Sequence, residues 1–319
     1  HLHPGKKLVA SQQAHYTHQR IADVLQLPFV AVPCDQTARM DMNALETLLQ
    51  TGEVGTVVAT IGTTAAGAVD PLPALLELQA TYNFRIHADA AYGGYFTLVE
   101  NLRAETQATY ANLHRVDSLV IDPHKHGLQP YGCGCILFKD PAIGALYKHD
   151  SPYTYFSSEE LHLGEISLEC SRAGAAAVAL WATQRLLPLV GGGAFAGRLA
   201  KSRQAAQQLA AKIQADPRWL LAFDPELDIV VWAPRAARAS QISQGSRALF
   251  AAAARANLHL AVASFPATLL QATWPDIIWD QDQVACLRSC LIKPEHLDWV
   301  EQIWQTLNNV AAETLISEE

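Results

Sequence analysis

Short apolar runs alternate with helical stretches through the first half of the chain, and this alternation constrains the fold more than any other feature. Strands are expected at 8–11, 29–32, 57–60, 85–89, 118–121 and 135–138. Helices are expected at 18–25, 42–49 and 72–82, with Asp41 and Asp70 as N-caps and Pro71 in the first helical position. Each helical stretch is long enough to cross over between parallel strands. The pattern predicts an α/β fold with a mostly parallel sheet.

The second half predicts a smaller α/β unit behind a glycine run. A helix is expected at 173–189, glycines at 191–193 interrupt the pattern, and a second helix follows at 195–215. Further strands are expected at 229–232, 258–263 and 285–292, with helices at 243–256 and 295–309. We therefore predict a large domain over residues 1–190 and a small C-terminal domain over residues 194–319.

Composition argues against several classes of partner. The 319 residues, half of them hydrophobic, are enough for two cores. The net charge of -8 is spread along the chain, and the 23 basic residues form no block that could follow a phosphate backbone. The most apolar stretch, at 173–183, is far shorter than the roughly 20 residues of a membrane span. We expect neither a nucleic acid nor a membrane as partner.

Six scattered cysteines point to a reducing compartment. The closest pairs, Cys133 with Cys135 and Cys286 with Cys290, lack the doubled Cys-x-x-Cys spacing of a zinc site. We expect buried, reduced thiols in a cytoplasmic protein that has no signal peptide and no metal site. The chain begins at His1, and its first strand already has a buried character with nothing before it to cover it. This predicts a fragment.

Polar residues follow three of the expected strands. Thr64 comes after the strand at 57–60, Asp89 ends the strand at 85–89, and Asp122 and Lys125 follow the strand at 118–121. In open α/β sheets the carboxyl ends of the strands face the ligand crevice. Small residues after Asp89 would let a flat cationic ring approach the backbone, and a desolvated lysine such as Lys125 can form a Schiff base.

Each of the two main candidates has a simpler interpretation when it is taken alone. Asp89 would then be a helix cap or turn former, and Lys125 an ordinary solvated lysine. Their separation favours the functional interpretation, because 36 residues leave room for one helix and one strand. Both side chains can therefore reach one crevice from neighbouring strands.

Several motifs resemble those of the pyridoxal-dependent group II amino-acid decarboxylases. They are His87-Ala-Asp-Ala-Ala-Tyr-Gly-Gly94, Asp117-Ser-Leu-Val-Ile-Asp-Pro-His-Lys125, Ser11-Gln-Gln-Ala-His15, Thr60-Ile-Gly-Thr-Thr64 and Gly164-Glu-Ile-Ser-Leu-Glu-Cys-Ser-Arg172. The resemblance covers residues 8 to 185 well and the rest loosely. It implies a fold-type-I pyridoxal phosphate enzyme, pyridoxal 5'-phosphate as cofactor, and a homodimer.

The resemblance also implies roles for individual residues. Lys125 would bind the cofactor covalently, and Asp89 would be the partner of the pyridine nitrogen. His15 would stack on the ring as a polarisable imidazole. The remaining implied contacts are Ala91 on the opposite face of the ring, Thr64 near the cofactor hydroxyl or the substrate carboxylate, Asp122 near the phosphate, and His124 near the lysine linkage.

A tyrosine on the loop after the lysine-bearing strand would return a proton to Cα. Tyr153 is the preferred candidate and Tyr155 the alternative, whereas Arg172 is expected to be structural. The implied reaction is decarboxylation of an aromatic or acidic L-amino acid to its amine and carbon dioxide. Two alternatives stay open. One is an aldehyde-releasing pyridoxal lyase resembling sphingosine phosphate lyase, and the other is a non-catalytic truncated homologue, because the family's glycine-rich phosphate-binding turn is missing from the sequence.

Overall fold

A six-stranded sheet forms the N-terminal part of the molecule. The computed structural model describes residues 5–146, 148 and 174–315. The strands, in the spatial order β2-β1-β3-β4-β5-β6, are all parallel except for β6, which runs antiparallel to β5. Their bounds are β1 Lys7–Ser11, β2 Phe29–Val32, β3 Val54–Thr60, β4 Arg85–Asp89, β5 Ser118–Ile121 and β6 Cys135–Phe138. The predicted α/β fold with a mostly parallel sheet is confirmed.

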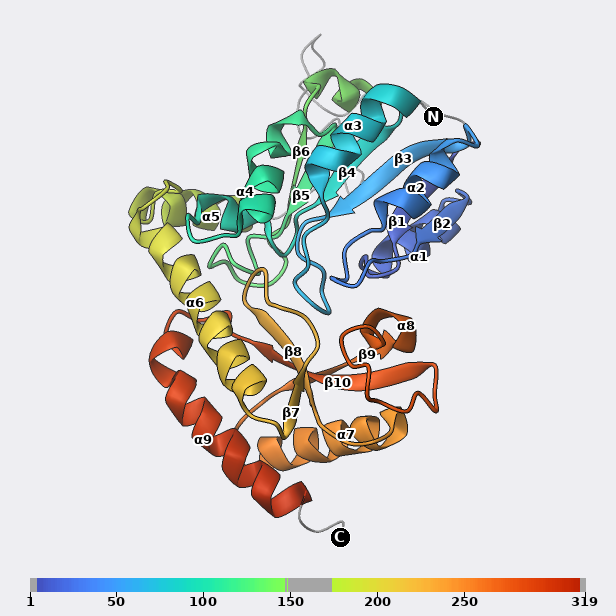
Figure 1. Ribbon diagram of the computed structural model, residues 1–319. Helices are drawn as coiled ribbons and strands as arrows, with labels where there is room; N and C mark the ends of the chain where they lie inside the picture. Colours follow the sequence, from blue (N-terminus) through green and yellow to red (C-terminus); the bar gives the residue numbers. More distant parts are fainter. Residues whose placement is uncertain (1–4, 147, 149–173, 316–319) are drawn as a thin grey trace.

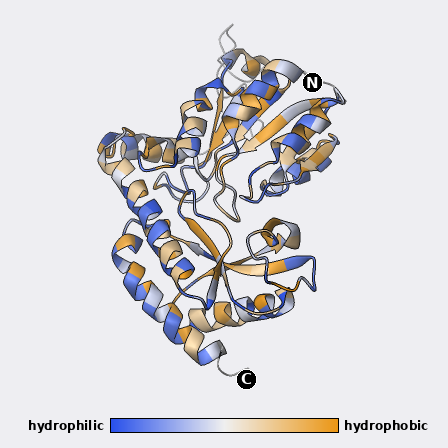
Figure 2. Ribbon diagram, viewed as in Figure 1, coloured by the Kyte–Doolittle hydropathy of each residue, from blue (hydrophilic) through white to orange (hydrophobic). Residues whose placement is uncertain are grey.

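Helices α2, α3 and α4 lie side by side over this sheet (Figure 1). Their buried leucines, such as Leu45 and Leu75, pack with strand residues such as Val57 and Ile86 into one core. Figure 2 shows the matching apolar colouring of the central strands. The N-terminal helices are α1 Thr17–Val24, α2 Met42–Leu49, α3 Leu72–Tyr82, η1 Gly94–Leu98, α4 Ala104–Ala111, η2 Leu113–Arg115, η3 Pro141–Leu146 and α5 Ala175–Leu186.

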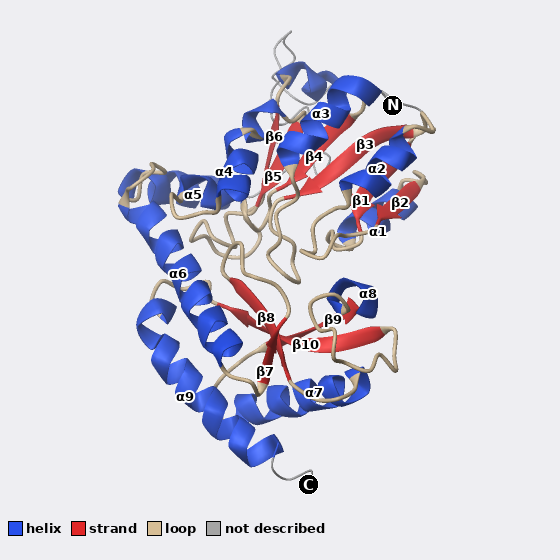
Figure 3. Ribbon diagram, viewed as in Figure 1, coloured by secondary structure: helices blue, strands red, loops and turns tan. Residues whose placement is uncertain are grey.

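A second, four-stranded sheet of order β7-β8-β10-β9 forms the C-terminal part. All of its strand pairs are antiparallel. Its strands are β7 Trp219–Leu221, β8 Ile229–Pro234, β9 Ala261–Pro266 and β10 Gln283–Cys290, and its helices are α6 Ala194–Ala215, α7 Ala239–Arg255, α8 Ala267–Leu270 and α9 His296–Leu315. The loops that follow the strands of the first sheet gather between the two sheets (Figure 3).

Helix α6 belongs to both parts of the molecule. Its first turns bury Phe195 and Leu199 in the core of the large sheet, whereas Leu209 and Ile213 near its end pack against the small sheet. The helix, which begins directly after the glycine run, thus packs against both sheets and joins them. The division into residues 1–190 and 194–319 stays a prediction.

Two expected helix caps have different outcomes. Asp41 caps α2, because its carboxylate accepts hydrogen bonds from the amides of Asn43 and Ala44. The prediction for Asp70 is wrong, since the N-cap of α3 is Pro71, with no side-chain bond. The fully buried Asp70 carboxylate instead accepts from the Met40 and Thr60 amides at 2.8 and 2.7 Å. It joins the end of β3 to the segment before α2 rather than starting a helix.

The five cysteines in the described part of the chain are all free thiols. Cys133 and Cys286 are buried, but Cys290 is exposed, so the expectation of uniformly buried thiols is wrong. Within the same residues no helix combines the length and the apolar character that crossing a bilayer requires.

Candidate active site

One pocket at the carboxyl ends of β3, β4 and β5 collects most of the predicted site residues. Its volume is about 330 Å³, within the range of small-molecule sites. Parallel strands end at the same edge of the sheet, which explains why residues far apart in sequence meet there. The predicted residues that line this pocket are His15, Thr64, Asp89, Ala91, Asp122 and Lys125.

Asp89 presents a shielded carboxylate at the end of β4. The residue is 8% exposed. Its Oδ2 lies 2.8 Å from Nε2 of His18, and its Oδ1 accepts a hydrogen bond from the Ala91 amide at 3.2 Å. Burial alone would raise the pKa of Asp89. The hydrogen bond and charge of His18, together with the Ala91 amide and the charge of His87, lower the pKa by more than burial raises it, so it lies below its usual 3.8. The carboxylate is therefore ionised at neutral pH.

Lys125 lies in a turn directly after β5. The turn is closed by a 2.9 Å hydrogen bond from the Lys125 amide to the Asp122 carbonyl. The Lys125 amine lies 3.0 Å from Oδ2 of Asp122. The lysine and Asp89 thus reach one pocket from neighbouring strands, as their sequence separation suggests. Asp122 contacts the lysine amine, and its expected position at a phosphate stays a prediction.

His15 and Thr64 both line the pocket. The Nδ1 atom of His15 is 2.5 Å from the Thr17 hydroxyl, and the ring lies 4.4 Å from that of Tyr16. Burial lowers the pKa of His15 below its usual 6.5, with a partly opposing effect of Asp89. Thr64 is exposed, and its backbone carbonyl accepts a hydrogen bond from Arg288 of the small sheet.

Of the predicted residues that the structure describes, His124 is not part of the pocket wall. His124 directs Nδ1 to the Cys133 carbonyl at 2.7 Å, and its ring packs on Tyr131. Its Nε2 lies 3.7 Å from Oδ2 of Asp122, so His124 contacts the turn of Lys125 without lining the pocket. Tyr153 and Arg172 lie outside the described residues, so their roles stay predictions.

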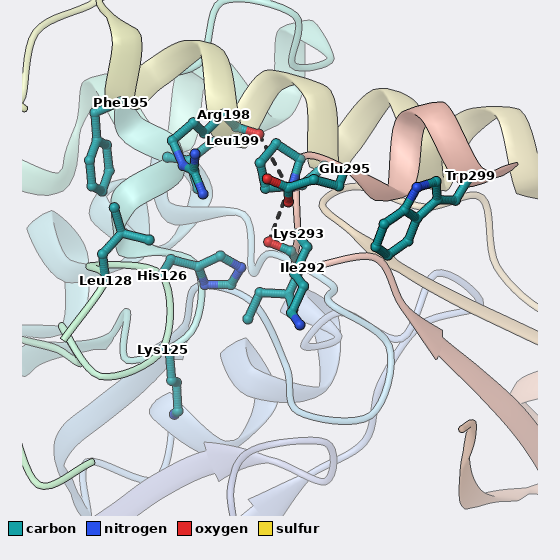
Figure 4. Close-up of a pocket in the computed structure, with 12 residues that line it drawn as sticks. Lys125, His126, Leu128, Phe195, Arg198, Leu199, Ile292, Lys293, Glu295 and Trp299 are labelled. Carbon is teal, nitrogen blue, oxygen red and sulfur yellow. Dashed lines mark hydrogen bonds between the residues drawn. The ribbon is translucent and has the colours of Figure 1, made fainter. Parts of the chain in front are cut away.

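A second cavity, of about 530 Å³, lies on the other side of the Lys125 turn. Residues of α6 and of the segment that leads into α9 line it, among them Arg198 and Glu295 (Figure 4). The Lys125 side chain extends away from both of these residues in Figure 4. Its amine therefore belongs to the first pocket, beside Asp122.

Sequence reasoning missed two groups of residues around the Lys125 turn. His18 binds Asp89, and its only signal is that it follows His15 by three residues at the start of an expected helix. The second group is a triad of the buried His126 and Asp228 with the half-buried Tyr92, in which Asp228 accepts from the Tyr92 hydroxyl at 2.7 Å and lies 2.8 Å from Nε2 of His126. Asp228 is 102 residues from His126, so no local pattern could reveal the pair.

Gly93 fits the loop after β4 closely against the end of β3. Its amide donates to the Ile61 carbonyl at 2.9 Å, and its carbonyl accepts from the Tyr110 hydroxyl at 2.7 Å. A Cβ atom at this position would overlap the Ile61 carbonyl oxygen. Gly93 is thus required by packing within the chain, in addition to any space it leaves for a ring.

Replacing Gly93 with alanine is expected to lower the free energy of unfolding by about 1–3 kcal/mol, the usual effect of overpacking. Gly197→Ala is the matched control, because nothing lies within 4 Å of a Cβ at this position in α6. The control is expected to be neutral or stabilising by up to about 1 kcal/mol. Chemical denaturation measures both changes, and equal effects of the two variants would contradict the packing argument.

The free energy of unfolding is expected to decrease as the pH is lowered, partly because of His87. Burial and the nearby His18 lower the pKa of His87 below its usual 6.5, against the pull of Asp89. The folded state therefore binds fewer protons than the unfolded state just below pH 6.5. The contribution of His87 to stability is present above that pH and is lost as the pH falls.

The corresponding variant is His87→Gln. When the pH is lowered from about 8 to about 5, its free energy of unfolding is expected to fall less than that of the wild type. His114→Gln, which removes an exposed histidine, is expected to keep the wild-type dependence. Denaturation curves across this range provide the measurement, and a His87 variant with the wild-type slope would contradict the assignment.

The described pocket fits part of a pyridoxal phosphate molecule. The shielded, ionised Asp89 suits a protonated ring nitrogen, and the Lys125 amine suits the aldehyde carbon. Among the described residues of the wall, Lys125 is the only lysine and there is no arginine, so they include no evident phosphate cradle. A mostly parallel sheet with this aspartate and lysine at its carboxyl edge defines the fold-type-I class of pyridoxal enzymes.

The chain belongs to the pyridoxal-dependent decarboxylase family. The family's conserved domain matches residues 4–234, most of the chain. Pyridoxal phosphate is accordingly the cofactor that this domain uses. The fold agrees with the crystal structure of Oryza sativa TDC with PLP and tryptamine, at a TM-score of 0.80, 19% identity and coverage of 98% of this chain and 63% of that chain.

Two proteins named as amino-acid decarboxylases have sequences similar to that of this chain. A protein of Methanothermobacter thermautotrophicus named "Probable L-tyrosine/L-aspartate decarboxylase" is 30% identical over 237 residues, which are 71% of this chain and 60% of the relative. The L-tyrosine decarboxylase of Enterococcus faecium is 33% identical over 58% of this chain and 37% of the relative. The chain thus spans less than two thirds of the length of these relatives.

Proposed function

We propose that this chain is the cofactor-binding part of a carboxy-lyase that converts an L-amino acid to its amine and carbon dioxide. The observation that carries the proposal is the meeting of the Asp89 carboxylate and the Lys125 amine in one pocket at the ends of β4 and β5. The site composition suits a planar cationic ring with a carbonyl substituent. The relatives named as decarboxylases support the choice of reaction.

The cofactor, when bound, supplies an electron sink for the electrons of the broken bond between Cα and the carboxylate. Asp89 would hold the proton on the ring nitrogen, because its pKa is low and its carboxylate is shielded from water. Lys125 would anchor the cofactor, with Asp122 holding the amine at 3.0 Å. His15 and Ala91 would hold the ring between them. Thr64, at the rim, would bind the substrate carboxylate or the cofactor hydroxyl.

Tyr153 would return the proton to Cα, and this assignment comes from the resemblance of the loop sequence to that of the family. Asp122 and His124 complete the proposed cofactor site at the phosphate and at the lysine linkage. For the substrate we propose an aromatic or acidic L-amino acid, which agrees with the tyrosine and aspartate in the names of the relatives.

We also propose a homodimer in the cytoplasm. Support for the dimer comes from two separate groups of large exposed apolar side chains, one at α1 and one on α5, since exposed apolar patches often mark an interface. They are Ile21 and Val24 on α1 with Leu25 directly after it, and Val178, Trp181 and Leu186 on α5. The free thiols of the described cysteines agree with a reducing compartment. Sedimentation of the purified protein tests the dimer.

The reaction is tested by trapping carbon dioxide from a panel of L-amino acids. The protein is incubated with tyrosine, tryptophan, aspartate and glutamate, with and without added pyridoxal phosphate. Release of carbon dioxide together with the matching amine, dependent on the cofactor, is the expected result. Release of an aldehyde without carbon dioxide would show the lyase alternative. Cofactor binding without turnover of any substrate would show a non-catalytic homologue.

A further inference from the structure

His18 makes a shielded contact with the Asp89 carboxylate. The residue lies in the first turn of α1, and its Nε2 is 2.8 Å from Oδ2 of Asp89. The side chains are 17% and 11% exposed, so water screens their interaction little. The other carboxylate oxygen is held by the Ala91 amide. Donors therefore fix both oxygens of Asp89, and each oxygen keeps a lone pair for a further donor.

The other cationic or titratable groups around the pocket have different partners. His87 directs Nδ1 to the Ser118 hydroxyl at 2.8 Å, and His15 directs Nδ1 to Thr17. The Lys125 amine lies at Asp122. Among the residues that the structure describes in this pocket, His18 thus provides the one side-chain hydrogen bond to Asp89.

Burial by itself would make Asp89 a poor counter-ion. Removing a carboxylate from water favours its protonated form, which cannot stabilise a proton on a ring nitrogen. The hydrogen bond and charge of His18 are the largest effects that oppose this burial and keep the pKa of Asp89 below its usual value. The orientation and the charge of the carboxylate at the end of β4 therefore depend on a residue of helix α1.

We propose that His18 is a positioning residue that holds Asp89 ionised and oriented toward the ring nitrogen of the cofactor. This inference rests on the proposed function, because it takes Asp89 as the partner of that nitrogen. His18 acts through Asp89 and needs no contact with the substrate. A substitution of His18 should therefore change cofactor binding at the nitrogen end and leave the other contacts of the ring unaltered.

The test measures dissociation constants of pyridoxal phosphate for purified apoprotein by absorbance titration. His18→Leu removes the hydrogen bond, and His18→Gln keeps a donor on a side chain of comparable reach. We expect His18→Leu to weaken binding about tenfold or more, as for the loss of a hydrogen bond to a charged group. His18→Gln should recover at least part of this loss. His114→Gln should bind as the wild type does.

Two further measurements separate positioning from a merely structural role. A cofactor analogue with carbon in place of the ring nitrogen should bind the wild type and His18→Leu equally, because Asp89 then has no partner on the ring. In the Asp89→Asn background, His18→Leu should cause little additional loss, since the two residues act as one unit. Thermal unfolding of each apoprotein verifies that it is folded.

The outcomes distinguish the inference from the proposed function. If the wild type does not bind pyridoxal phosphate, the proposed function fails and the inference fails with it. If the wild type binds and His18→Leu binds equally well, only the inference fails. An equal loss of affinity for the cofactor and for the analogue would also overturn it, because the effect would then not pass through the ring nitrogen.

Discussion

Replacing Lys125 with alanine is expected to remove the visible absorbance of the lysine-bound cofactor and to lower kcat by at least about 100-fold. The variant loses the only amine in the described pocket wall that can bond covalently to the cofactor. The lower limit is what a single positioned proton-transfer group usually contributes. Absorbance after reconstitution and the rate of carbon dioxide release give the two measurements.

Lys125→Arg separates the covalent role of the lysine from its charge. The guanidinium keeps a positive charge near Asp122 but stays protonated and cannot act as a nucleophile. We therefore expect the arginine variant to lose the same absorbance as the alanine variant. Lys201→Ala, which removes an exposed lysine from α6, should resemble the wild type. If Lys125→Ala kept the wild-type spectrum, the assignment of this lysine would be wrong.

Replacing Asp228 with alanine is expected to lower the free energy of unfolding by about 2–5 kcal/mol, because it removes the acceptor of two shielded hydrogen bonds and each donor left without a partner costs about 1–3 kcal/mol. Asp228 and the side chain of His126 are almost entirely shielded, at 0% and 1% exposure. Burial and the neighbouring Asp228 raise the pKa of Tyr92 well above its usual 10, so its hydroxyl remains a donor. The variant leaves this hydroxyl and Nε2 of the imidazole without a partner, whereas Nδ1 keeps its contact with the Tyr92 carbonyl at 3.0 Å.

Asp224→Ala is the matched control, four residues earlier in the same segment. Its carboxylate is 72% exposed and pairs with Arg103 on the surface. Surface pairs contribute at most about 1 kcal/mol. Chemical denaturation of both variants therefore should show a large difference between them. A small effect of Asp228→Ala, comparable to that of the control, would rule out an energetic role for the triad.

The triad also connects the two sheets at the lysine turn. Asp228 directly precedes β8 of the small sheet, while His126 directly follows Lys125 in the large part. The ring of His126 packs edge-on against Tyr92 and Phe96, at 4.6 and 5.1 Å between centroids. The C-terminal part of the chain thus supports the turn that carries the proposed cofactor lysine.

Elements with a clear periodicity could be predicted closely from sequence. The bounds of β2, β4, β5, β6, α2 and α3 agree with the expected ranges. Helix α4 was not anticipated, because two of its buried residues are the polar Thr106 and Thr109. Their hydroxyls donate to the Glu226 carboxylate and the Asp70 carbonyl. A helix that buries polar side chains lacks the apolar stripe on which such predictions depend.

The sequence by itself determined the α/β fold and the position of Asp89 and Lys125 at the ends of neighbouring strands. Both follow from local periodicity, because a polar residue after a buried parallel strand must emerge at the same edge of the sheet. Only the tertiary structure decided which distant groups support these residues. His18 lies 71 residues from Asp89, and Asp228 lies 102 residues from His126. Such pairs depend on how helices and sheets pack together, and no short-range pattern in the chain encodes that packing.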